Sequence, residues 1–160
     1  MRVLSKLITF FSQRPKTILL LMEAYLFLGL ARILKMMPFS KVAPLLGDHM
    51  KETSHIDLDR NNRMIKNVSH AVHIMSRYTF WESHCLVKAI AGMKMLERRG
   101  IDSTLYLGTA KDEEGKMIAH AWLRSGPFYI SGAEGMDRFA VVSKFAKRIG
   151  DNLLEGESDE

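Results

Sequence analysis

The order of the predicted elements indicates an α+β fold, with helices before Gly100 and antiparallel strands after it. In the first part of the chain, apolar residues recur at three- and four-residue spacing, which is typical of helices that pack on a core. After Gly100, short β-rich segments alternate with turn sequences, which indicates strands. A chain of 160 residues, 47% of them hydrophobic, is long enough for one domain with a real core.

Residues 1–47 are the most apolar part of the chain, and we expect a helical segment that packs on the core. Residues 17–36 fit a long helix that ends before Pro38, and residues 40–46 fit a short helix that stops at Gly47. A glutamate interrupts the long apolar run, which is therefore shorter than the roughly 18–20 residues that a membrane span needs. A peripheral membrane contact or a docking surface for a protein partner is the alternative.

Glu23 lies in the middle of the long helix, where a charge must face water, a partner or a buried counter-charge. We predict that Glu23 marks the exposed edge of this helix. Leu21 and Tyr25 should then face the core or its rim. Leu20 and Phe27 lie on the Glu23 side and should belong to the disputed face.

The core domain is predicted over residues 58–150, after a polar loop at residues 48–57. Its first part contains two helices, residues 59–78 and residues 85–99. Strands are predicted at residues 104–110, 117–124 and 128–131, and a turn at residues 112–116 joins the first two. A closing helix is predicted at residues 138–149. The acidic tail at residues 151–160 is expected to be disordered.

The charge and the single cysteine restrict the function. The formal net charge is +5, but basic and acidic residues are scattered, so we expect no nucleic-acid partner. Cys85 is the sole cysteine, which excludes an intramolecular disulfide and a Cys-rich zinc site. We expect a cytoplasmic protein without a metal or cofactor.

Cys85 lies at the start of a predicted helix, two residues after Ser83, which we take as the N-cap. The unpaired N–H groups and the positive end of the helix dipole then point towards the thiol. Both favour the thiolate, which is the nucleophilic form. The alternative is that Cys85 is a small buried hydrophobe.

His120 differs from the five other histidines because it falls within an apolar strand segment, residues 118–123 (IAHAWL). A flanked imidazole needs a partner for its ring nitrogens. A cysteine at a helix N-terminus facing a histidine on a strand is the arrangement of thiol hydrolases. We therefore predict Cys85 as nucleophile and His120 as base.

Several segments resemble one family. Residues 81–86 (WESHCL) and 119–122 (AHAW) are similar to the cysteine and histidine motifs of the lasso-peptide biosynthesis B proteins, and residues 104–108 (TLYLG) and 34–39 (LKMMPF) are similar to further parts of them. The peptidase half of these proteins belongs to the transglutaminase-like superfamily. The resemblance implies a papain-like cysteine protease core, in which the nucleophile helix packs on a small antiparallel sheet behind N-terminal helices.

The resemblance also implies a function. The protein would remove the leader from a ribosomally made lasso precursor peptide through a thioester acyl-enzyme, with the backbone N–H of Cys85 as one oxyanion donor. A separate small leader-binding protein would deliver the substrate, and an ATP-dependent lasso cyclase would act afterwards. The chain looks like the stand-alone peptidase.

The third catalytic group departs from the family pattern, in which an aspartate follows the histidine by about a dozen residues. If residues 125–126 form a two-residue turn, Ser131 lies opposite His120, and the nearest carboxylates downstream are Glu134 and Asp137. Each of these three residues is a candidate. Two other functions stay open: an acyl transferase that uses the same thioester, and a non-catalytic helical adaptor in a peptide-maturation complex.

Overall fold

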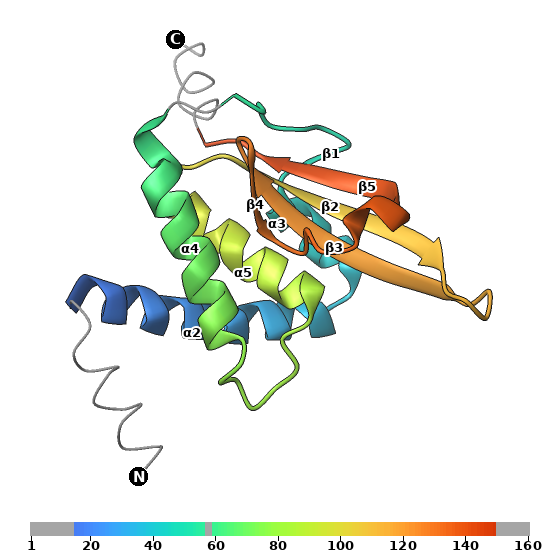
Figure 1. The fold of residues 1–160 in the computed structure, drawn as a ribbon, viewed down its shortest axis with the longest axis horizontal. Helices are drawn as coiled ribbons and strands as arrows, with labels where there is room; N and C mark the ends of the chain where they lie inside the picture. The colour runs from blue at the N-terminus through green and yellow to red at the C-terminus, as the bar shows by residue number, and fades with distance from the viewer. Residues whose placement is uncertain (1–14, 57–58, 150–160) are drawn as a thin grey trace.

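The computed structural model describes residues 15–56 and 59–149 and has the predicted α+β architecture (Figure 1). Its α-helices are α2 (Pro15–Met36), α3 (Phe39–Leu46), α4 (Asn62–Met75) and α5 (Cys85–Glu97). Its strands are β1 (Asp48–His49), β2 (Ser103–Lys111), β3 (Met117–Ser125), β4 (Phe128–Ser131) and β5 (Ala140–Lys147), with short 3-10 helices η1 (Asp59–Asn61) and η2 (Met136–Arg138).

The five strands form one antiparallel sheet in the order β1-β5-β2-β3-β4. α5 packs on one face of this sheet, and α2 packs on α5 and α4 at the far side from the strands (Figure 1). Gly92 allows α5 to approach closely, because a Cβ there would lie 2.9 Å from the Leu123 side chain of β3 and 3.2 Å from that of Ile130. The core therefore lies between α5 and the sheet.

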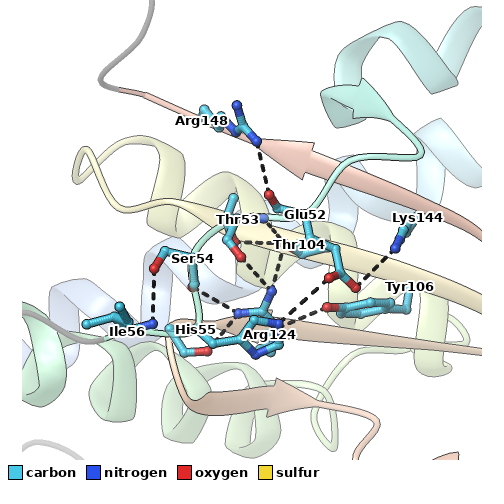
Figure 2. A network of polar contacts seen from close by, with 11 residues as sticks. Glu52, Thr53, Ser54, His55, Ile56, Thr104, Tyr106, Arg124, Lys144 and Arg148 are labelled. Carbon is cyan, nitrogen blue, oxygen red and sulfur yellow. Dashed lines mark hydrogen bonds and ion pairs between the residues drawn. The ribbon is translucent and has the colours of Figure 1, made fainter.

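The opposite face of the sheet is covered by two chain segments. Since β4 is an edge strand and β5 pairs with β2, the chain at residues 132–139 must cross β3 and β2. The second segment, residues 50–56, is held by Arg124, whose side chain is 1% exposed (Figure 2). The Arg124 guanidinium donates hydrogen bonds to the carbonyls of Thr53, Ser54 and Gly126 and to the Tyr106 hydroxyl.

Glu52 lies beside this buried guanidinium and also pairs with Lys144 at 3.4 Å. Burial acts to raise the pKa of Glu52, but hydrogen bonds with Tyr106 and Lys144 outweigh it and hold that pKa below its usual value. Because every donor of Arg124 that faces the interior finds an acceptor, the burial of this cation is compensated. The network fixes the segment 50–56 on the outer face of the sheet.

The predicted closing helix at residues 138–149 is wrong, because this segment forms β5. β2 needs a pairing partner on its second edge, and β5 supplies it with Phe145 opposite Leu105. Both side chains are buried in the core. Val141 and Val142 also favour a strand. The predicted loop is corrected in part, since Asp48 and His49 pair with β5 as the short strand β1.

The prediction for Glu23 is also wrong. Its side chain is mostly buried and accepts two hydrogen bonds of 2.7 Å from the Arg99 guanidinium at the end of α5. The Arg99 hydrogen bonds lower the pKa of Glu23, burial opposes them, and the charges of Arg99 and Arg98 lower it further.

Leu21 is buried and Tyr25 half-buried, as predicted, while Leu20 and Phe27 pack partly against the core. The parts of the predictions that fall on residues 1–14, 57–58 and 150–160 lie outside the described residues.

Glu23→Gln should lower the free energy of unfolding by about 1–3 kcal/mol near neutral pH, because Arg99 keeps its position but loses its charged acceptor. The folded-state pKa of Glu23 is lowered, so this stability is present above the unfolded value of 4.5 and is lost as the pH falls through the folded pKa. Urea denaturation of both proteins at about pH 7 and about pH 3 measures the difference. Glu113→Gln, in the exposed turn before β3, is the control and should be neutral. A gap that is equal at both pH values would contradict the assignment.

Candidate active site

Cys85 is the first residue of α5, and its side chain is half-buried. The N-cap is His84, with an extended backbone and no side-chain hydrogen bond to the helix. The predicted N-cap Ser83 is wrong, because its hydroxyl pairs with the Thr79 hydroxyl at 2.8 Å. The first N–H groups of α5 therefore have no side-chain cap and stay available to an anion at the thiol.

The turn before α5 is fixed by Trp81. Its ring lies 5.2 Å from the Tyr25 ring of α2, and a Cβ at Gly29 would lie 3.5 Å from the same indole. Packing against α2 therefore sets where α5 begins and where the thiol lies. The indole N–H of Trp81 is buried and has no hydrogen-bond partner in the described part of the protein.

His120 lies in β3, on the outer face of the sheet, between two aromatic rings. The Trp122 ring stacks at 5.8 Å and the Phe139 ring lies at 5.0 Å from the imidazole. His120 Nε2 is 2.7 Å from the carbonyl oxygen of Gly132. Because a carbonyl only accepts, Nε2 carries the proton in the neutral ring, and Nδ1 keeps a lone pair for a second partner.

Gly132 is the point where the chain leaves β4 and starts to cross the sheet. Its φ is +75°, and a Cβ would lie 2.3 Å from the Ala121 carbonyl oxygen and 2.9 Å from the Trp122 Cα. No side chain fits there, so an aspartate of the kind that similar triads carry is excluded at this position. The main chain supplies the acceptor for His120 instead.

The three sequence candidates for the third group lie elsewhere. The predicted register is wrong, since Ser131 pairs with Leu123 and not with His120. The turn is at residues 126–127, and the register shifts between Leu123 and Arg124. Ser131 is buried, and its hydroxyl has no hydrogen-bond partner among the described residues. Glu134 and Asp137 are exposed in the crossing segment. The sequence did not indicate Gly132 as the acceptor, because every residue has a backbone carbonyl and the residue type does not mark the one that binds His120.

The strand alternation separates His120 from the helix that carries Cys85. Leu123 contacts Gly92 of α5, so the odd-numbered residues of β3 face the helices. His120 and Trp122 belong to the even-numbered set on the outer face, and no hydrogen bond joins His120 to Cys85 in the described structure. β4 pairs with β3 only as far as Leu123, so His120 lies where β3 is the edge of the sheet.

No group of three or more His, Cys, Asp or Glu side chains in the described ranges, 15–56 and 59–149, is placed to hold a metal ion. Cys85 and His120 provide a thiol at a helix N-terminus and an oriented imidazole.

The neutral His120 ring should be the Nε2–H tautomer, since Gly132 offers an acceptor to Nε2. Nitrogen chemical shifts from long-range ¹H–¹⁵N correlation spectra in mildly alkaline solution report which nitrogen is protonated. His84, which is exposed next to Cys85, serves as the comparison. A His120 ring with its proton on Nδ1 would contradict the assignment.

Gly132→Ala should destabilise the fold by more than the roughly 1–2 kcal/mol that left-handed backbone alone costs a non-glycine residue, because its Cβ meets backbone atoms. Gly100→Ala is the matched control: its φ is +66°, but nothing lies within 4 Å of the added Cβ. Thermal unfolding measures both variants. An equal loss of stability in the two variants would show that the chain at Gly132 does not pack closely against the backbone of β3.

The sequence comparisons agree with this architecture. A family model described as transglutaminase-like superfamily (Transglut_core3) matches residues 27–144, which run from within α2 into β5 and include both Cys85 and His120. No curated protein and no solved structure matches the sequence. The match covers well over half of the chain, and the chain therefore belongs to the transglutaminase-like superfamily.

Proposed function

We propose that the protein is a cysteine peptidase that removes the leader from a ribosomally made lasso precursor peptide, with Cys85 as nucleophile and His120 as general base. The observation that carries the proposal is the hydrogen bond from His120 Nε2 to the Gly132 carbonyl. It leaves Nδ1 as the basic atom of an oriented ring, on a chain whose one cysteine starts a helix. Membership of the superfamily supports a thioester mechanism.

In the first half of the reaction, Nδ1 takes the thiol proton, and the Cys85 thiolate attacks the carbonyl carbon of the scissile bond. The oxyanion is stabilised by uncapped N–H groups at the start of α5, that of Cys85 among them. The C–N bond then breaks, and Nδ1–H protonates the leaving amine, which is the new N-terminus of the core peptide. The leader remains bound to sulfur as a thioester.

In the second half, Nδ1 removes a proton from a water molecule, whose oxygen attacks the thioester carbonyl. Collapse of this intermediate releases the leader with a free carboxylate and returns the proton to sulfur. Gly132 takes no part in bond making. Its carbonyl keeps the imidazole in one tautomer and stabilises the imidazolium, the task of the aspartate in other triads.

The proposal requires Cys85 and His120 to meet when substrate is bound. His120 lies where β3 is the edge of the sheet, and Cys85 lies at a helix end. A peptide bound across this edge would bring its carbonyl to both groups. We propose that a small leader-binding protein presents the peptide there, in the cytoplasm, and that the ATP-dependent lasso cyclase then uses the product.

Cys85→Ala and His120→Ala should each lower precursor cleavage by roughly a thousandfold or more, and the double variant should be hardly worse, because the two groups act as one unit. Mass spectrometry of the precursor after incubation with the protein and the leader-binding partner measures the products. His84→Ala is the matched control, since this exposed histidine is the direct neighbour of the nucleophile and should leave cleavage unchanged. Cleavage by folded Cys85→Ala at the wild-type rate would falsify the mechanism.

The same experiment distinguishes a peptidase from an acyl transferase and from a non-catalytic adaptor. With a primary amine added in excess, an acyl transferase would give the leader as an amide, while a peptidase gives mainly the carboxylate. If the leader-binding partner alone cleaved nothing and Cys85→Ala still supported maturation, the protein would be a non-catalytic adaptor.

A further inference from the structure

α2 carries apolar residues on two opposite faces. One face packs on the core through Leu21, Ala24, Leu28, Ala31 and Leu34. On the other face, large aliphatic side chains repeat at three- and four-residue spacing and are exposed: Leu19, Met22, Leu26, Leu30 and Ile33. We call these five residues the α2 stripe. It runs along a helix of 22 residues, about 33 Å, and has no partner in the described structure.

Further exposed apolar residues continue the α2 stripe at both sides. Met36, Met37 and Phe39 extend it at the C-terminal end of α2. Phe80, which is 90% exposed, packs on Trp81, and Trp81 lies against α2. α2 forms one outer side of the molecule, with the sheet on the other side (Figure 1). The surface is therefore broad, and it is separate from the sheet face that holds His120.

The charged residues of α2 and α3 are mostly basic. They are Lys16, Arg32, Lys35 and Lys41, with Glu23 as the acidic exception. Arg99 and Arg98 neutralise Glu23, so it adds no free negative charge to this side. Lys16, Lys35 and Lys41 are exposed. An exposed apolar stripe on a segment with a net positive charge complements an anionic lipid surface.

Two other arrangements fit this surface less well. By length and composition α2 could cross a membrane, which corrects the expectation that Glu23 makes the apolar run too short. Part of α2 is buried in the protein, however, and the Glu23–Arg99 pair would have to break for the helix to leave the fold. A second copy of the chain would bring together two segments that carry the same net positive charge, which repel each other. A helix that lies in the plane of the membrane avoids both costs.

We propose that the α2 stripe docks the folded protein on an anionic membrane surface, with α2 parallel to the bilayer and Lys16, one turn before Leu19, at the headgroups. The aliphatic side chains enter the interface, and Phe80 enters beside them. This proposal does not depend on whether Cys85 is catalytic. Docking would place the start of α5, which follows the Phe80 turn, near the lipid surface.

The test is co-sedimentation of the full chain with vesicles of phosphatidylcholine alone or mixed with phosphatidylglycerol. Wild-type protein should bind the mixed vesicles, and about 0.5 M NaCl should weaken the binding. Leu26→Gln with Ile33→Gln should lower the affinity at least roughly tenfold, because two side chains that are 70% and 55% exposed in water lose their burial in lipid. Their thermal unfolding should stay as in wild type, since neither side chain packs in the core.

The matched control is Val142→Gln with Ile56→Gln, two apolar residues that are 55% and 80% exposed outside α2. This variant should bind as wild type does. Wild-type protein that stays in the supernatant with both vesicle types would overturn the proposal, as would equal loss of binding in both double variants. A wild-type dimer that Leu26→Gln with Ile33→Gln converts to a monomer, measured by light scattering without vesicles, would assign the stripe to a second copy instead.

Discussion

The close passage of the chain over β3 at Gly132 is the constraint on which the sheet and the candidate site both depend. β4 ends at the edge of the sheet, and the next strand must pair with β2 on the far side of β3. The chain can turn back only by running against the Ala121–Trp122 backbone, where a Cβ does not fit. This passage completes the sheet and brings a carbonyl to the imidazole of His120. A glycine, which has no side chain to offer, thus supplies an acceptor for His120 from its main chain.

The two faces of the sheet are stabilised by different interactions. On the helix side, small residues such as Gly92 let α5 approach, and burial of aliphatic side chains supplies the free energy. On the outer side, a buried guanidinium, Arg124, binds the carbonyls of a segment without regular structure (Figure 2). Such a segment has no strand partner for its carbonyls, and the five donors of an arginine can satisfy several at once.

α2 combines structural and surface roles. Its buried face and the bidentate Glu23–Arg99 pair fix it to α5, and through Trp81 it also sets the start of the helix that carries Cys85. Its opposite face is aliphatic and exposed. The membrane proposal and the peptidase proposal therefore concern neighbouring parts of the molecule but depend on different residues, so each can fail without the other.

The sequence alone determined those features that local patterns encode. Helices α2, α3 and α5, the β2–β3 hairpin and β4 follow from apolar spacing and from glycines at their ends, and Cys85 and His120 are marked by their residue types and by the family motifs. Tertiary structure decided the rest. Residues 140–147 are a strand because β2 offers a free edge, Glu23 is buried because Arg99 meets it from 76 residues away, and His120 is oriented by a backbone carbonyl. These contacts join distant segments or involve main-chain atoms, which every residue has, so no local residue pattern can report them.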